Sequence, residues 1–141
     1  MECYDDNVNK YTTEKEWTTN VNKIIRVNIY NRGMINKINI FTNIIILHCS
    51  YTNLESLQGI NKLTNLKELQ CSNNQLRDVR NILFLRNLVE IDIELPEHIQ
   101  LIINMNLIIN ERNMYYDEQN VHNSDVQQSL IKSIINLMND L

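Results

Sequence analysis

A pattern of apolar residues repeats every 22 residues through the middle of the chain. Its clearest copy is the stretch LKELQCSNNQL, from Leu66 to Leu76. Leu69 and Cys71 point to one side of a short strand, and Asn74 stands in the turn that leaves it. An Asn at this place can bond backbone groups that no strand partner reaches. The stretch therefore predicts a strand followed by a sharp turn.

The same pattern recurs one unit earlier and one unit later. The earlier copy has Ile44, Leu47, Cys49, Thr52 and Leu54 at these positions, and the later copy has Leu88, Ile91 and Ile93. Between the strands the matching pairs are Leu57 and Val79, Ile60 and Ile82, and Leu63 and Leu85. A period of about 20–29 residues is typical of a solenoid whose units bury their apolar faces against each other.

The chain resembles the leucine-rich-repeat family from Ile44 to Ile93, because these positions fit the template L-x-x-L-x-L-x-x-N/C-x-L. The resemblance implies an α/β repeat, a short solenoid with a parallel sheet on its concave face. We expect repeats over residues 21–98, with the best copies at 44–87. The first repeat is degenerate, with a strand at Ile24 to Ile29 whose Ile25 and Val27 point inward.

The two ends of the chain depart from the repeat. Residues 1–20 are polar and are expected to form an N-terminal cap with a short helix around Thr13 to Thr19, or to be partly disordered. Residues 99–141 are expected to form a C-terminal cap. In it, residues 99–110 form either a strand or a buried helix. A capping box at Ser124 and an apolar stripe predict a helix at about 125–139, packed on the open end of the repeats.

The sequence from Tyr115 onward is similar to a tail that follows short leucine-rich repeats in uncharacterised proteins of giant DNA viruses. The resemblance carries no known activity. The resemblance implies a viral origin.

The composition indicates which classes of partner and which cellular compartment to expect. A net charge of −4 argues against nucleic acid or an anionic membrane surface as the main partner. No run approaches the ~18 apolar residues of a membrane span, and because the first residues have no apolar stretch we expect no signal peptide there. Cys3, Cys49 and Cys71 do not make an even disulfide framework and are expected to be buried thiols. We therefore expect a cytoplasmic protein, or one of the host-cell cytoplasm if the chain is viral.

The sequence offers no visible catalytic or metal site. His48, His98 and His122 are scattered, and none stands at a metal-ligand spacing from a second His or Cys. No nucleophile elbow, zinc-protease motif or phosphate-binding glycine loop occurs. We expect no enzyme activity, no metal and no cofactor.

Alternate strand residues should face away from the core, on the concave side of the sheet. These outward residues are Ile24, Arg26, Asn28, Ile46, His48, Ser50, Glu68, Gln70, Ser72, Glu90, Asp92 and Glu94. They change from apolar and basic to acidic along the chain, which suits a protein partner with a basic patch. The competing interpretation is an ordinary solvated sheet. The candidate partner-binding residues are His48, Tyr51, Glu68, Gln70, Glu90 and Asp92.

The leading hypothesis is a monomeric, non-enzymatic protein-interaction module, as the family resemblance implies. The alternatives are a substrate-recruiting adaptor of a ubiquitin-ligase system, and a truncated remnant without function. Because no Cys follows Cys71, a C-terminal cysteine-dependent ligase domain is not expected in this chain.

Overall fold

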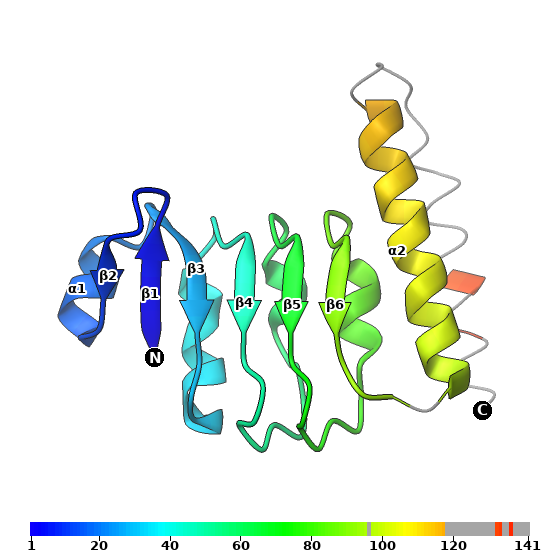
Figure 1. Ribbon diagram of the computed structural model, residues 1–141, viewed down its shortest axis with the longest axis horizontal. Coiled ribbons are helices and arrows are strands. Elements are labelled where there is room, and N and C mark those ends of the chain that lie inside the picture. Colours follow the sequence, from blue (N-terminus) through cyan, green and yellow to red (C-terminus); the bar gives the residue numbers. More distant parts are fainter. Residues whose placement is uncertain (96, 118–131, 134–135, 137–141) are drawn as a thin grey trace.

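One sheet connects the described strands in the order β2-β1-β3-β4-β5-β6 (Figure 1). The computed structural model describes residues 1–95, 97–117, 132–133 and 136. Strands β3 (Ile24–Asn28), β4 (Ile46–His48), β5 (Glu68–Gln70) and β6 (Glu90–Asp92) are parallel and in sequence order. Strands β1 (Glu2–Asp5) and β2 (Lys10–Tyr11) extend the sheet in antiparallel fashion.

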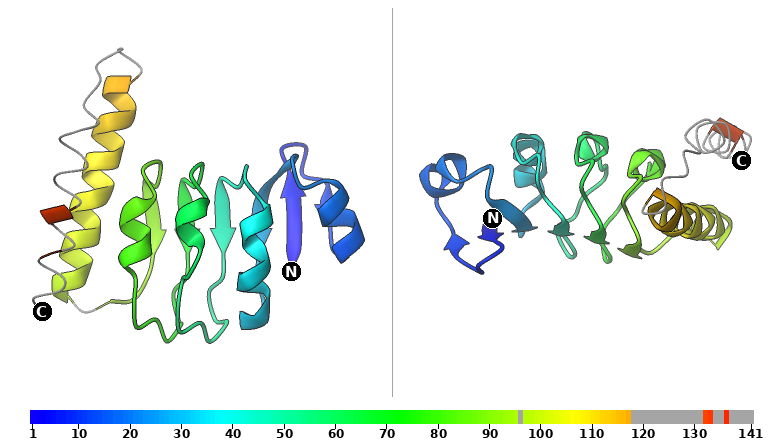
Figure 2. Two further views of the ribbon diagram at one scale, coloured as in Figure 1. Left: turned by 180° about the vertical axis from the view of Figure 1, so that it is seen from behind. Right: turned by 90° about the horizontal axis from the view of Figure 1, so that it is seen from above.

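Short 3₁₀ helices carry the chain back between the parallel strands. They are η1 (Arg32–Ile40), η2 (Ile60–Lys62) and η3 (Arg80–Phe84), and all three lie on one side of the sheet (Figure 2). The core fills the space between these helices and the sheet. Leu47 and Leu69 are fully buried and pair across neighbouring strands. The predicted α/β repeat with parallel strands is therefore confirmed.

The first repeat departs from the predicted register. Val27 pairs with Leu47, a spacing of 20 residues instead of 22. Ile24 is consequently buried in the core, so its predicted place on the outward face is wrong. Ile25 is only half-buried, so its predicted inward place is also wrong. Ile38 of η1 still matches Ile60 of η2 at a spacing of 22 residues, and both are buried. The turn between β3 and η1 is therefore two residues shorter than the corresponding turn of the next repeat.

The N-terminal segment contains a β-hairpin that the sequence analysis did not predict. β1 pairs with both β2 and β3. Asp5 holds the hairpin turn, accepting hydrogen bonds from Asn9 N at 2.9 Å and from the Tyr11 hydroxyl at 2.8 Å. Asp5 also accepts a hydrogen bond from Asn9 Nδ2 at 2.9 Å. This side-chain bond, followed by that from Tyr11 and those from the backbone, lowers the pKa of Asp5. Alternate residues of β1, Cys3 and Asp5, are buried. In the sequence, the only hint of this strand is the short alternation Glu2-Cys3-Tyr4-Asp5.

The helix predicted near Thr13 is present as α1 (Glu14–Thr19). Thr13 and Glu16 form a capping box, in which each side chain bonds the other residue's backbone N–H. The buried Trp17 ring packs at 5.7 Å from the Phe41 ring, at the end of the first repeat. This contact ties α1 to the core.

The segment 99–110 is helical, within α2 (Glu97–Asp117), which lies beyond β6 (Figure 1). Its Ile103 is fully buried, and Asn110 Nδ2 donates to the carbonyls of Leu85 at 2.9 Å and Leu88 at 3.0 Å. Thus α2 packs on the last repeat, a place predicted for the helix at 125–139. Of that predicted helix the structure describes only residues 132, 133 and 136, which are helical, and the rest lies outside the described residues. The division into segments 1–20, 21–98 and 99–141 stays a prediction.

Among the helices that the structure describes, none has the length and apolar character of a membrane span.

Cys3, Cys49 and Cys71 are buried free thiols, as predicted. Burial raises the pKa of Cys3 to about 12. The pKa of Cys71 is raised by its hydrogen bond with Cys49 and by burial.

Asn106 gives the first testable prediction. It is 1% exposed within α2, and neither polar atom of its amide has a hydrogen-bond partner among the described residues. A buried unpaired polar group costs about 1–3 kcal/mol. Leu has the same number and branching of side-chain heavy atoms as Asn, with larger methyl groups in place of the polar ones, so Asn106→Leu should raise the free energy of unfolding by up to this amount in urea denaturation. Asn110→Leu is the matched control and should lower it, because the Leu85 and Leu88 carbonyls would lose their donor. A destabilised Asn106→Leu variant would contradict the prediction.

Candidate functional site

The outward side chains of the strands form two rows across one face of the sheet, here called the sheet face. By strand register, the first row contains Tyr4, Arg26, Ile46, Glu68 and Glu90, and the second contains Glu2, Asn28, His48, Gln70 and Asp92. Neighbouring strands in a sheet lie about 4.8 Å apart, so adjacent members of a row are within contact range. The register therefore brings five of the six predicted binding residues onto one surface.

Three of these predicted residues make direct contacts at the centre of the sheet face. Gln70 Nε2 donates to Glu68 Oε1 at 2.7 Å. His48 Nε2 lies 3.2 Å from the same oxygen. Both the His48 and the Glu68 side chains are half-buried, with 31% and 24% of their surface exposed. We call these three side chains the His48 cluster. It is fixed by its own hydrogen bonds and presents an ordered polar surface.

A second polar chain lies next to the cluster. Ser72 Oγ donates to Asp92 Oδ2 at 2.8 Å and lies 3.2 Å from Ser50 Oγ. This bond orients one carboxylate on the exposed strand β6. The two serines occupy the same position in adjacent repeats and were predicted on the outward face, but not as part of the site.

Tyr51 lies apart from the His48 cluster, in the turn after β4. It is 77% exposed and has a left-handed backbone, with φ of 58°. The next repeat has Asn73 at the same position, with φ of 56°. Asn tolerates this conformation, whereas an aromatic residue rarely adopts it. Tyr51, Tyr30 and Arg32 line a hollow of about 290 Å³ at this edge of the sheet.

The N-terminal hairpin extends the sheet face with a network that the sequence analysis missed. Glu2 forms an ion pair with Lys10 and accepts hydrogen bonds from the hydroxyls of Tyr4 and Tyr30, both at 2.8 Å. The bond from Lys10, followed by those from Tyr30 and Tyr4, lowers the pKa of Glu2 to about 2. Lys10 and Arg26 thus stand on the hairpin side of the sheet, opposite the acidic residues of β5 and β6.

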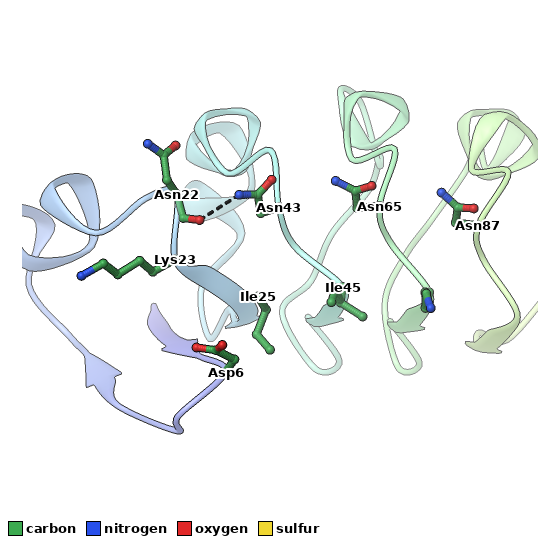
Figure 3. A pocket seen from close by; sticks show the side chains of 9 residues that line it. Asp6, Asn22, Lys23, Ile25, Asn43, Ile45, Asn65 and Asn87 are labelled. Atoms are coloured by element: carbon green, nitrogen blue, oxygen red, sulfur yellow. Dashed lines mark hydrogen bonds between the residues drawn. The ribbon is translucent and has the colours of Figure 1, made fainter.

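A groove lies where the chain enters the strands (Figure 3). We call it the asparagine groove. It encloses about 620 Å³ and is lined by Asp6, Asn22, Lys23, Ile25, Asn43, Ile45, Asn65, Lys67 and Asn87. This groove was not predicted from the sequence. Its signal was the 22-residue spacing of Asn43, Asn65 and Asn87.

Among the side chains that the structure describes, no three of His, Cys, Asp or Glu gather as metal ligands would. The described side chains of the sheet face and of the asparagine groove interact through hydrogen bonds and charges.

The repeat segment matches a known family. The model described as "Leucine Rich repeats (2 copies)" matches residues 42–87. Residues 42–87 are leucine-rich repeats. This confirms the resemblance, and the matched segment includes β4, β5 and the whole His48 cluster. No curated protein matches the chain. The similarity of the tail to viral leucine-rich-repeat proteins stays a prediction.

Tyr51 gives the second testable prediction. A left-handed non-glycine residue costs roughly 1–2 kcal/mol, and less for Asn. Tyr51→Asn copies the residue that the next repeat uses, so it should raise the free energy of unfolding by about 1 kcal/mol. The reverse change, Asn73→Tyr, is the control and should lower it. Thermal and urea unfolding measure both. Destabilisation by Tyr51→Asn would show that the ring contributes more to folding than its backbone costs.

Glu2 gives the third prediction, a pH dependence. Its pKa is about 2 in the folded protein, against an ordinary value of 4.5. Because the folded-state pKa is lowered, the stabilisation is fully present above about pH 4.5 and is lost as pH falls towards 2. NMR titration of the Glu2 carboxyl carbon should show this low midpoint. Glu2→Gln should remove the corresponding part of the stability change between these pH values. A midpoint near 4.5 would contradict the network.

Proposed function

We propose that the chain is a non-enzymatic module that binds a partner protein through the sheet face. Leucine-rich-repeat domains generally mediate protein–protein interaction, and the family is typically non-enzymatic. The observation that carries the proposal is the His48 cluster, in which Glu68 fixes both His48 and Gln70. An ordered polar surface costs less conformational entropy on binding than a mobile one.

The acidic side of the sheet face selects the chemistry of the partner. Glu90, Asp92 and Glu94 are exposed, and Asp92 is oriented by Ser72. Carboxylates on neighbouring positions repel one another, and a cationic surface relieves that repulsion. We therefore propose a partner with a patch of Lys or Arg. Complementary charge of this kind raises the association rate and fixes orientation more than it raises affinity.

Tyr51 supplies the apolar part of the proposed contact. Tyr is enriched in binding hot spots because it buries a large area and retains a polar tip. Together with Tyr30 it frames the hollow at the edge of the sheet. The proposed interface therefore combines an aromatic edge with an acidic face.

The adaptor hypothesis uses the same face, and differs in what else the partner binds. Recovery of ubiquitin-ligase subunits together with the partner would favour it. A remnant would retain no partner. The monomeric state, the cytoplasmic location and the viral origin stay predictions.

The fourth prediction tests the sheet face by charge reversal. Glu90→Lys and Asp92→Lys together should leave the fold intact, because exposed substitutions seldom change stability by more than ~0.5 kcal/mol each. They should slow association with the partner several-fold. The difference should shrink as salt rises, because exposed charges are screened over about 8–10 Å. Proteins captured from a cell lysate by both baits in parallel identify the partner, and biolayer interferometry with the purified partner gives the rates.

The matched control reverses charges on the helical side of the repeats. Lys62→Glu and Arg86→Glu are suitable, whereas Arg80 is not, because it forms an ion pair with Asp78 at 2.7 Å. Adding Glu68→Lys to the first variant breaks the His48 cluster as well and should also speed dissociation. If the control variant lost the partner while the sheet-face variant kept it, the binding face would be the helical side.

A further inference from the structure

The asparagine groove lies on a different edge of the repeats from the proposed interface. Its wall is a ladder of side-chain amides at the repeat spacing. Asn43 Nδ2 donates to the Asn22 carbonyl at 2.8 Å, Asn65 Nδ2 to Thr42 at 3.1 Å, and Asn87 Nδ2 to Thr64 at 2.7 Å. Each amide thus donates one N–H to a backbone carbonyl of the preceding unit, and its Oδ1 accepts no hydrogen bond from another described residue. The wall therefore offers a row of fixed, free acceptors.

The floor of the groove is a second row, parallel to the amides. Ile25, Ile45 and Lys67 occupy the same repeat position, immediately before the paired residues Arg26, Ile46 and Glu68. Figure 3 shows Ile25 and Ile45 beside the row of asparagines. Half-buried isoleucines in a groove of this size form an apolar patch that a ligand side chain can cover.

Two lysines stand beside this apolar floor. Lys23 lies at the β3 end and Lys67 follows Ile45 in the floor row. Within the residues that the structure describes, neither ammonium group has an ion-pair partner. The lining contains one opposing charge, that of Asp6. The groove is thus net positive in a chain whose net charge is −4.

We propose that the asparagine groove binds an extended acidic peptide of a partner protein, with the pattern acidic–x–aliphatic–x–acidic. The free amide oxygens accept hydrogen bonds from peptide N–H groups, the aliphatic side chain lies on Ile25 and Ile45, and the two carboxylates pair with Lys23 and Lys67. This partner chemistry is opposite to that proposed for the sheet face. The two surfaces can therefore succeed or fail independently.

The spacing of the groove fits this pattern. The three positions of the floor row span about 10 Å, at about 4.8 Å per strand. Lys23 lies beyond Ile25, on the side away from Ile45 (Figure 3). Alternate side chains of an extended peptide lie about 6.6–7 Å apart, so the first and fifth residues are about 13 Å apart. The two carboxylates can thus reach both lysines while the central side chain covers the isoleucines.

The experiment titrates the protein with the blocked peptide acetyl-Glu-Ser-Val-Ser-Glu-amide and follows NMR spectra. The side-chain amides of Asn43, Asn65 and Asn87 and the methyl groups of Ile25 and Ile45 should shift, and the resonances of Glu90 and Asp92 should not. Lys23→Glu with Lys67→Glu should weaken binding about tenfold, because two exposed ion pairs become repulsive. Asp6→Asn should tighten it about twofold, because a like charge is removed.

Two controls make the result decisive. The peptide acetyl-Lys-Ser-Val-Ser-Lys-amide should bind about tenfold more weakly than the acidic one. Lys62→Glu with Arg86→Glu removes the same charge away from the groove and should leave the affinity unchanged. Spectra of the free variants confirm that each is folded. Absence of binding to the unaltered protein, equal affinity for both peptides, or full affinity of the Lys23→Glu, Lys67→Glu variant would overturn the proposal.

Discussion

The hydrogen bonds of Asn74 hold two adjacent turns of the repeat together. Its Nδ2 donates to the carbonyls of Cys49 and Cys71, both at 2.9 Å, and its Oδ1 accepts from the backbone of Thr52 at 3.2 Å and Leu54 at 3.0 Å. These groups lie beyond the strand ladder, and leaving such groups buried and unpaired would be costly. Because the turns are fixed in this way, the strands before them share one register. The His48 cluster depends on that register.

The same requirement explains the other edge of the array. Where the chain enters the strands, the amides of Asn43, Asn65 and Asn87 satisfy carbonyls of the preceding unit. At the end of the array Asn110 does the same for Leu85 and Leu88. An amide has two functional atoms, and only its NH₂ is used in the ladder. The row of free oxygens in the asparagine groove is therefore a consequence of how the repeats are joined.

Sequence periodicity predicted the parts of the fold that obey it. Leu47 and Leu69 are buried as expected, and the matching Ile91 of the last strand is half-buried, since units of a solenoid share one core. It failed where the period changes, as in the first repeat, whose turn is two residues shorter. It also missed the β1–β2 hairpin, because antiparallel pairing leaves no 22-residue signal. For the site, the 22-residue period predicted that His48, Glu68 and Gln70 lie together. It could not predict the left-handed backbone of Tyr51, because a Tyr residue does not signal that conformation.

Tyr51 and Asn73 separate the demands of folding from those of function. Both occupy the same repeat position, and both have φ near 57°, with values of 58° and 56°. Since folding imposes this conformation in both repeats, stability alone would favour Asn or Gly at each. The ring of Tyr51 is 77% exposed, so burial returns little of the backbone cost. A strained residue that folding does not require points to a role in recognition. We therefore propose the Tyr51 edge of the sheet face as part of the contact on conformational grounds that do not depend on the charges of that face.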